Sequence, residues 1–414
     1  MKAIFLQIIF VLTSNFYLLH AQLENEVVYS EQIKTVRAYR QGWDLSNPIL
    51  ILGSNDHIII DFDFISEESV DFDYEVIHCT KDWNISAIAE QDYINGFALN
   101  PVTDMQPSQN TLISYFHYTI ILPNADLSFK ISGNYLLRIR DRDGNIQFQR
   151  RFYVYQEKSI LEVNVKRPAK ADYADTHQDV EVKATLHGIN ATKDPKNELY
   201  MVVMQNFRTD CSRSGILPTY INGNSLQYKE NDNLLFPGLT EFRQFNCKNP
   251  RLPMNRISEI AFKHPTYYFR LLKDEDWQFK DYVTDPDING KYKIESYQQV
   301  LSDLRADYVY VTFTLSQDAP LLEGKLFING SFVQWQLQKN VEMIYDFETH
   351  QYQRTIMLKQ GYYNYMYSVL EKNTIDNIFM QGSHFESENE YQALLYYSNP
   401  SLRYDELVGY GRSK

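Results

Sequence analysis

The fold is decided by the stretch Ile58-Ile59-Ile60-Asp61-Phe62-Asp63-Phe64, in which apolar and acidic side chains alternate. Because side chains of a β-strand point alternately to its two faces, Ile58, Ile60, Phe62 and Phe64 share one face and the two aspartates lie on the other. This period predicts a β-strand with one face in a hydrophobic core.

The same pattern recurs along the chain. Alternating or apolar stretches lie at 72–77, 135–140, 148–155, 180–186, 199–204, 267–272 and 308–315. Asp143-Gly144 and Asn329-Gly330 are turn signals, and they predict β-hairpins, the second between 325–328 and 332–337. Strands at this spacing predict an all-β fold of tandem immunoglobulin-like β-sandwich domains with few short helices.

Two segments, 166–169 and 285–290, have the composition of linkers or turns. They divide the chain into a first β-sandwich domain at 22–165, a second β-rich domain at 166–292, and a third β-sandwich domain with a C-terminal tail at 293–414. Each interval has the size of an ordinary domain.

Residues 1–21 are predicted to be a secretory signal peptide. Lys2 precedes an apolar stretch, and Leu19-His20-Ala21 resembles a cleavage site. A transmembrane anchor is less consistent with the polar residues inside this stretch. We therefore expect an exported protein with no direct membrane insertion.

The composition excludes nucleic acid as an expected partner. The formal net charge is −13, and an acidic chain is repelled by phosphate backbones. The 32 Tyr and 24 Phe residues suit the pleated faces of sheets, and tyrosine also suits wet interfaces.

Motifs of catalysis and metal binding are missing from the sequence. It contains no H-E-x-x-H, no C-x-x-C, no G-x-S-x-G and no glycine-rich phosphate loop. The turn Asp285-Pro286-Asp287-Ile288-Asn289-Gly290 begins like a calcium-binding loop, but Ser296 stands where the bidentate glutamate is required. We expect no enzyme activity, no cofactor and no metal.

Three features have two interpretations each. The acidic run of Asp61, Asp63, Glu67, Glu68, Asp71 and Asp73 is a solvated outer sheet face, or else a calcium site or catalytic pair. Trp335 is a core residue of a sandwich, or else stacks on a sugar, which would make the protein an envelope glycan-binding protein. Cys79, Cys211 and Cys247 are free thiols, or else Cys211 and Cys247 form a disulfide.

The order of short motifs resembles the plug protein family of the type IX secretion system of Bacteroidota, which includes gliding bacteria. In the first half of the chain these motifs are Ile77-His78-Cys79, Asp82-Trp83, Tyr93-Ile94-Asn95-Gly96-Phe97, Asn110-Thr111, Tyr115-Phe116-His117-Tyr118, Leu122-Pro123-Asn124, Ser132-Gly133-Asn134-Tyr135 and Arg150-Arg151-Phe152. Further along they are Phe236-Pro237-Gly238, Glu241-Phe242-Arg243, Ala306-Asp307-Tyr308-Val309, Leu358-Lys359-Gln360-Gly361-Tyr362-Tyr363-Asn364-Tyr365, Gly382-Ser383-His384-Phe385-Glu386, Glu388-Asn389-Glu390-Tyr391 and Arg403-Tyr404-Asp405-Glu406-Leu407-Val408-Gly409. The loop around Leu239 departs from the family pattern.

The resemblance implies a periplasmic protein at the inner face of the outer membrane. It would dock on the periplasmic mouth of the outer-membrane translocon barrel of the SprA/Sov type and seal its pore when no substrate is engaged. The resemblance implies no catalytic, cofactor-binding or metal residues.

Tyr362, Tyr363 and Tyr365 surround the turn at Gly361. They are the candidate partner-interface residues, because a seal that must also release requires a polar, wet contact. The alternative is that these tyrosines pack across neighbouring strands of the third domain.

Overall fold

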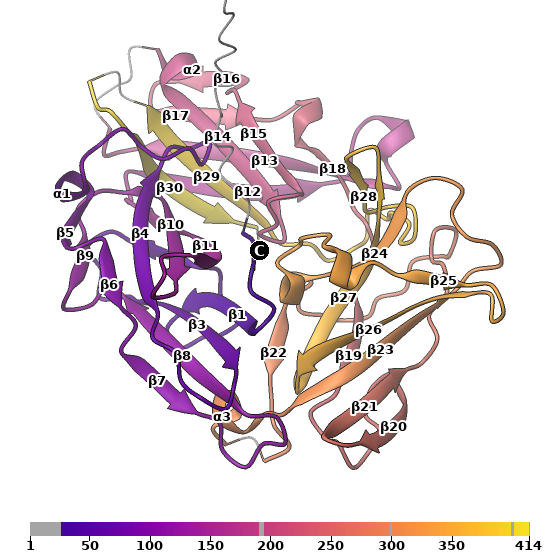
Figure 1. Cartoon of the computed structure of the whole chain (residues 1–414). Coiled ribbons are helices and arrows are strands. Elements are labelled where there is room, and N and C mark those ends of the chain that lie inside the picture. Colours follow the sequence, from indigo (N-terminus) through magenta and orange to yellow (C-terminus); the bar gives the residue numbers. More distant parts are fainter. Residues whose placement is uncertain (1–25, 190–193, 299, 399–400, 414) are drawn as a thin grey trace, which may run out of the picture.

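The chain forms three β-sandwich units, each with its own apolar core. The computed structural model describes residues 26–189, 194–298, 300–398 and 401–413, so the predicted signal peptide, 1–21, lies outside the described residues. Figure 1 shows the first unit in indigo and magenta, the second in pink and yellow, and the third in orange. The predicted all-β sandwich class is confirmed.

Helical segments are short in the described part of the chain. The α-helices there are α1 (Glu90–Tyr93), α2 (Pro195–Glu198) and α3 (Ser302–Arg305). Four 3-10 turns are η1 (Ala171–Tyr173), η2 (Asp232–Leu234), η3 (Ser331–Val333) and η4 (Lys339–Val341).

The first unit packs two sheets face to face. One sheet has the order β1 (Ile33–Arg40), β3 (Ile58–Ile65), β8 (Tyr115–Leu122) and β7 (Asp104–Pro107). The other has the order β2 (Ile49–Ile51), β11 (Ile146–Tyr155), β10 (Gly133–Arg140), β4 (Asp73–Cys79) and β6 (Leu99–Pro101), and β5 (Ile94–Gly96) pairs with β9 (Leu127–Phe129). The alternating stretch is β3, whose Ile58, Ile60, Phe62 and Phe64 lie in the core as predicted. The predicted hairpin at Asp143-Gly144 joins β10 to β11.

The second unit is completed by the C-terminal end of the chain. One sheet contains β12 (Ser159–Lys166), β13 (His177–Leu186), β17 (Ser225–Tyr228) and β16 (Tyr220–Asn222), and β18 (Leu235–Pro237) also pairs with β13. The other contains β15 (Ser212–Ile216), β14 (Leu199–Gln205), β29 (Tyr391–Ser398) and β30 (Asp405–Arg412). In Figure 1 the yellow strands β29 and β30 therefore lie beside pink ones.

The third unit is built around one long strand, β27 (Gly361–Glu371). Its neighbours are β19 (Arg243–Asn246), β22 (Tyr292–Ile294), β24 (Lys325–Asn329) and β28 (Thr374–Asp376). The facing sheet contains β20 (Ile257–Lys263), β21 (Thr266–Leu271), β23 (Tyr308–Ser316), β26 (Gln351–Lys359) and β25 (Ile344–Asp346).

The strand pairings differ from the predicted domain intervals. The first unit ends at β11 and the second begins at β12, so the segment 166–169 is a connection inside the second unit. The segment 285–290 lies inside the third unit, and 391–412 belongs to the second. The composition of a turn inside a domain resembles that of a linker, which explains both differences. The C-terminal strands belong to the second unit because β29 pairs with β14, which is distant in sequence.

The predicted hairpin at Asn329-Gly330 is wrong. β24 pairs with β27 along residues 366–370 instead of with 332–337. Residues 331–333 form a 3-10 turn, and the consecutive residues Gln334 and Trp335 adopt left-handed backbone angles that interrupt an extended strand.

Both sheets of the first unit also pack against another unit through their outer faces. The sheet that contains β10 and β11 packs against β14, β29 and β30 of the second unit through an apolar cluster that includes Ile49, Tyr153, Met204, Leu394, Tyr396 and Leu407. The Tyr396 hydroxyl donates to Asn134 Oδ1 at 2.7 Å across the same contact. The sheet that contains β1, β3 and β8 packs against the third unit, and this second contact is polar.

Candidate functional site

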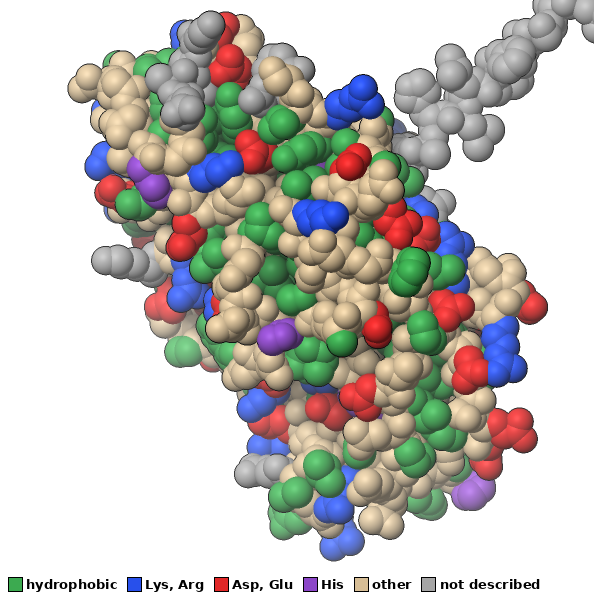
Figure 2. Space-filling model, turned by 90° about the vertical axis from the view of Figure 1, so that its left-hand side faces the viewer, with side chains coloured by type: hydrophobic (Ala, Val, Ile, Leu, Met, Phe, Trp, Pro, Cys, Tyr) green, Lys and Arg blue, Asp and Glu red, His purple; other side chains and the backbone are tan. Residues whose placement is uncertain are grey.

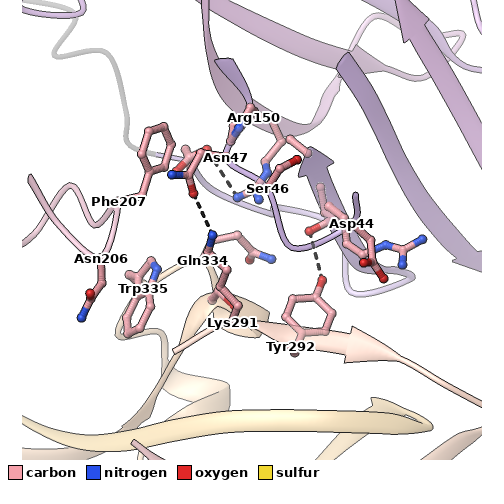
Figure 3. A pocket seen from close by; sticks show the side chains of 16 residues that line it. Asp44, Ser46, Asn47, Arg150, Asn206, Phe207, Lys291, Tyr292, Gln334 and Trp335 are labelled. Atoms are coloured by element: carbon pink, nitrogen blue, oxygen red, sulfur yellow. Dashed lines mark hydrogen bonds and ion pairs between the residues drawn. The ribbon is translucent and has the colours of Figure 1, made fainter. Parts of the chain in front are cut away.

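One cavity brings together side chains from all three units. Its volume is about 100 Å³, and its walls include Asn47 and Arg150 of the first unit, Phe207 of the second, and Lys291 and Trp335 of the third. Figure 3 shows these side chains converging from separate ribbons. We call this region the three-unit junction and treat it as the candidate functional site, because ligand and partner sites in multi-domain proteins occur preferentially where domains meet.

Lys291 ties the third unit to the first across the junction. Its Nζ donates to the Leu45 carbonyl at 2.6 Å and to Asn47 Oδ1 at 2.9 Å, and the second of these contacts is visible in Figure 3. The neighbouring Tyr292 hydroxyl donates to the Val36 carbonyl at 3.3 Å. Burial lowers the pKa of Lys291 to about 8, so the side chain is still mostly a cation at neutral pH.

Aromatic residues with strained backbone angles lie in the junction and beside it. Three aromatic residues of the described chain have a left-handed φ: Trp83 at 65°, Phe207 at 55° and Trp335 at 58°. Phe207 and Trp335 line the junction cavity, and Trp83 and Trp335 line an adjacent cavity of about 360 Å³. A bulky residue in this conformation persists only where its surroundings hold it, and such residues cluster at functional sites.

The first two residues of the acidic run, Asp61 and Asp63, are not solvated, which corrects the favoured interpretation of that run. Both are buried, because the third unit covers the outer face of β3. Asp63 accepts hydrogen bonds from His117 Nδ1 at 2.7 Å, from the Tyr308 hydroxyl at 2.6 Å and from Lys359 Nζ at 2.5 Å. Two of these three donors come from the third unit.

A second buried ion pair lies beside the first. The guanidinium of Arg37 binds both carboxylate oxygens of Asp61, at 2.8 and 2.6 Å, and also reaches Asp303 Oδ1 at 2.7 Å. The Tyr39 hydroxyl donates to the same Asp61 carboxylate at 2.8 Å. Each aspartate is thus held by several hydrogen bonds at the contact between the first and third units, and this arrangement supports a rigid contact. Farther along the run, Glu67, Glu68 and Asp71 are exposed as expected.

The charged groups of this network shift one another's pKa values. Burial alone would raise the pKa of Asp63, but Lys359 and His117 outweigh it and hold that pKa below its usual value. Burial alone would lower the pKa of His117, but its hydrogen bond to Asp63 and the charge of that carboxylate raise it. For Lys359, burial dominates and lowers the pKa despite Asp63.

These pKa shifts limit the pH range over which the network stabilises the contact between the first and third units. The contribution of Asp63 is present above its unfolded pKa of about 3.9 and is lost as the pH falls through the lower folded pKa. The contribution of His117 is complete below its unfolded pKa of about 6.5 and is lost as the pH rises through the higher folded pKa. The network is therefore strongest between these two limits.

A substitution at His117 measures the upper limit of this window. We expect His117→Gln to reduce the free energy of unfolding more at pH 5.5 than at pH 9, because the favourable imidazolium–carboxylate pair exists only at the lower pH. Urea unfolding of wild type and variant at both pH values gives the two differences. Equal destabilisation at both pH values would contradict a charged pair.

Two of the three candidate interface tyrosines are core residues, which corrects their expected role. Tyr363 stacks between the rings of Phe245 and Tyr292, and Tyr365 is fully buried with its hydroxyl donating to Asp274 Oδ2 at 2.7 Å. Cross-strand packing in the third unit, the alternative interpretation, accounts for both. Tyr362 is only partly buried and its hydroxyl bonds to Gln244, so it remains a candidate contact residue.

Trp335 is covered by protein and does not present a free stacking face. The guanidinium carbon of Arg208 lies 4.1 Å from the indole centroid, and Phe242 packs beside it at 5.9 Å. Gly290 approaches so closely that a Cβ there would lie 2.4 Å from the indole. This packing removes the observation on which the glycan-binding alternative depended.

The turn that begins like a calcium loop is held by its own backbone. Asp287 accepts hydrogen bonds from the Phe242 N–H at 2.5 Å and from the Asn289 N–H at 2.6 Å, and burial raises the pKa of Asp287 to about 7. In the described part of the chain no group of three or more His, Cys, Asp or Glu side chains could hold a metal ion. Cys79, Cys211 and Cys247 are free thiols.

Sequence reasoning missed the network around Asp63 and the strained residues of the junction. Alternation placed Asp63 on the outer face of its strand, but no local signal indicates that a strand almost 300 residues away covers that face. The motif Tyr115-Phe116-His117-Tyr118 contained one member of the network, and the motif that begins at Leu358 contained Lys359.

Comparisons with known proteins identify related chains. A family model described as the type 9 secretion system plug protein 1st domain matches residues 33–156. A crystal structure of a hypothetical protein from Parabacteroides merdae is 31% identical, covers 94% of this chain and 98% of its own, and superposes with a TM-score of 0.91. The BSP domain of a biofilm associated protein is 8% identical, with a TM-score of 0.19, over 95% of this chain and 61% of that one, and carries no structural argument. None of the curated proteins matches.

Proposed function

Because this chain belongs to the plug protein family of the type IX secretion system, we propose that it closes the pore of the outer-membrane translocon when no substrate is engaged. It docks at the periplasmic mouth of a barrel of the SprA/Sov type. The family match carries this proposal, and the architecture of the chain supports it.

A steric seal requires a body that keeps its shape. The three units have separate cores, and two different contacts fix them to one another. An apolar cluster joins the first unit to the second, and a buried ionic network joins the first unit to the third. Separate sandwiches joined by loose linkers would move independently; here the buried contacts favour one wide, rigid body.

A seal must also be released. Figure 2 shows one face of the molecule, on which hydrophobic, basic and acidic side chains are interspersed and none forms a large single-type area. Transient interfaces have this mixed, polar character, whereas permanent ones are more apolar. The surface therefore suits reversible docking.

A periplasmic location rests on the predicted signal peptide at 1–21 and on the family. Among the described residues, none of the helices has the length and hydropathy to cross a bilayer. The perturbed groups of the network, Asp63, Asp303 and Lys359, serve the contact between the first and third units, which supports binding without catalysis as the proposed action.

Co-purification tests the docking. The tagged full chain, cross-linked in cells and recovered from envelope membranes, is expected to bring down the translocon barrel in stoichiometric amounts. The same procedure in a strain that lacks the barrel provides the background. Retention on polysaccharide together with no enrichment of the barrel would contradict the proposal.

A further inference from the structure

A cavity of about 390 Å³ opens beside the three-unit junction, between the connection from β1 to β2 and the end of β30. Its walls include Arg40, Trp43, Lys291, Glu390, Tyr410 and Arg412. The first unit contributes Arg40 and Trp43, the second contributes Glu390, Tyr410 and Arg412, and the third contributes Lys291. The cavity is of the size at which ligand-binding clefts begin.

The charge of this cavity is opposite to that of the protein. Three cationic side chains and one carboxylate line it, in a chain whose net charge is −13. Arg412 lies 3.6 Å from Glu390, and Arg40 lies 2.8 Å from Asp56; both arginine side chains are about half exposed. Counting Asp56, the region holds three cations and two carboxylates, so it keeps a small net positive charge on an otherwise acidic molecule.

Lys291 provides a cation whose hydrogen-bond partners are neutral. Its two acceptors are the Leu45 carbonyl and the Asn47 side-chain amide. An ammonium group has three N–H donors, so one remains for a further acceptor. A carboxylate in the cavity would complete this set, and its charge would add to that of Glu390, which by itself does not offset the burial that lowers the pKa of Lys291.

Trp43 indicates what kind of molecule carries that carboxylate. Its side chain is 55% exposed beside Gly42, which has a left-handed φ of 89° at the turn. Tryptophan, tyrosine and arginine are the residues that dominate binding energy in protein–protein contacts, and this cavity presents all three. A small inorganic anion would use the cations but not the indole.

We infer that this cavity receives an acidic, partly apolar segment of another polypeptide. A carboxylate of that segment contacts Lys291 and Arg412, and an apolar side chain packs on Trp43. The inference does not rest on the proposed function, because it concerns the chemistry of the cavity and not the identity of the partner.

Fluorescence anisotropy with defined peptides tests whether the cavity binds an acidic, partly apolar polypeptide. The probe is a capped, fluorescein-labelled peptide of alternating glutamate and leucine, and the reference peptide has glutamine in place of each glutamate. The full mature chain is expected to bind the acidic peptide at least about tenfold more tightly at low salt, and the difference should shrink as salt is added.

Substitutions locate the binding. Trp43→Ala and Arg412→Ala are each expected to weaken binding of the acidic peptide by about tenfold, as for hot-spot residues. Arg270→Ala is the matched control, since Arg270 is a half-exposed arginine on β21 that pairs with Glu259. Unchanged melting temperatures confirm that the variants fold, as the exposure of the substituted side chains predicts.

Three outcomes would overturn the inference. These are equal affinity for the acidic and neutral peptides, loss of binding in the Arg270→Ala control to the same extent as in the two cavity variants, and displacement of the acidic peptide by inorganic phosphate at equal concentration. The last outcome would indicate a site for simple anions instead of a polypeptide.

Discussion

Replacing Lys359 with methionine is expected to reduce the free energy of unfolding by about 3–5 kcal/mol. The change removes the cation from a fully buried pair and leaves the Asp63 carboxylate inside the contact between the first and third units. Methionine has a similar length and no charge, so the loss reports the missing lysine partner of Asp63, which keeps only His117 and Tyr308, and not a cavity. Urea unfolding at pH 7 measures the effect.

Two further variants isolate the cause. Lys372→Met removes a lysine whose side chain is 80% exposed and which pairs with Glu323 and Glu371; its effect is expected to stay within about 0.5 kcal/mol. Adding Asp63→Asn to Lys359→Met is expected to recover part of the lost stability, since it removes the buried carboxylate that has lost its lysine partner. Similar losses for Lys359→Met and Lys372→Met would show that the buried pair does not hold the units together.

Replacing Tyr365 with alanine is expected to cost about 3–5 kcal/mol, as for other large aromatic residues in cores. The Tyr365 ring packs against Phe245 and Phe313, and its hydroxyl is one of two that donate to the buried carboxylate of Asp274. The substitution therefore opens a cavity and removes a hydrogen bond from a buried charge. Thermal unfolding compared with wild type provides the measurement.

Tyr362→Ala is the matched comparison, three residues away on the same strand. Its side chain is partly exposed, and we expect a loss of less than about 1.5 kcal/mol. If Tyr365→Ala left stability unchanged and reduced recovery of the translocon barrel, Tyr365 would be a contact residue after all. Reduced recovery with Tyr362→Ala alone would support the one candidate tyrosine that the structure leaves accessible.

Local pattern predicted the sandwiches because alternation reports which side of a strand is apolar. Ile58, Ile60, Phe62 and Phe64 point into the first core for that reason. The same pattern does not show what covers the other side of the strand, so from sequence alone it predicts that Asp61 and Asp63 face solvent. Their true environment depends on Lys359 and Asp303, which only the packing of the units brings near.

The tyrosines illustrate the same limit. A tyrosine at a turn suits a wet surface and a core equally well by composition, and only the neighbours of β27 decide between them. Tyr363 pairs across the strands with both Phe245 and Tyr292 and is buried as a result. The sequence likewise does not predict that β29 and β30 join the second unit, since no local signal marks β14 as the partner of β29.

The permeability of the outer membrane tests the proposed plug most directly. Uptake of a large antibiotic, normally excluded by the outer membrane, is compared in wild type, in a strain lacking this protein, and in a strain lacking both this protein and the translocon. Steric sealing leads us to expect high uptake only in the strain that keeps an open translocon. Equal uptake in all three strains would contradict the proposal that this protein seals the translocon pore.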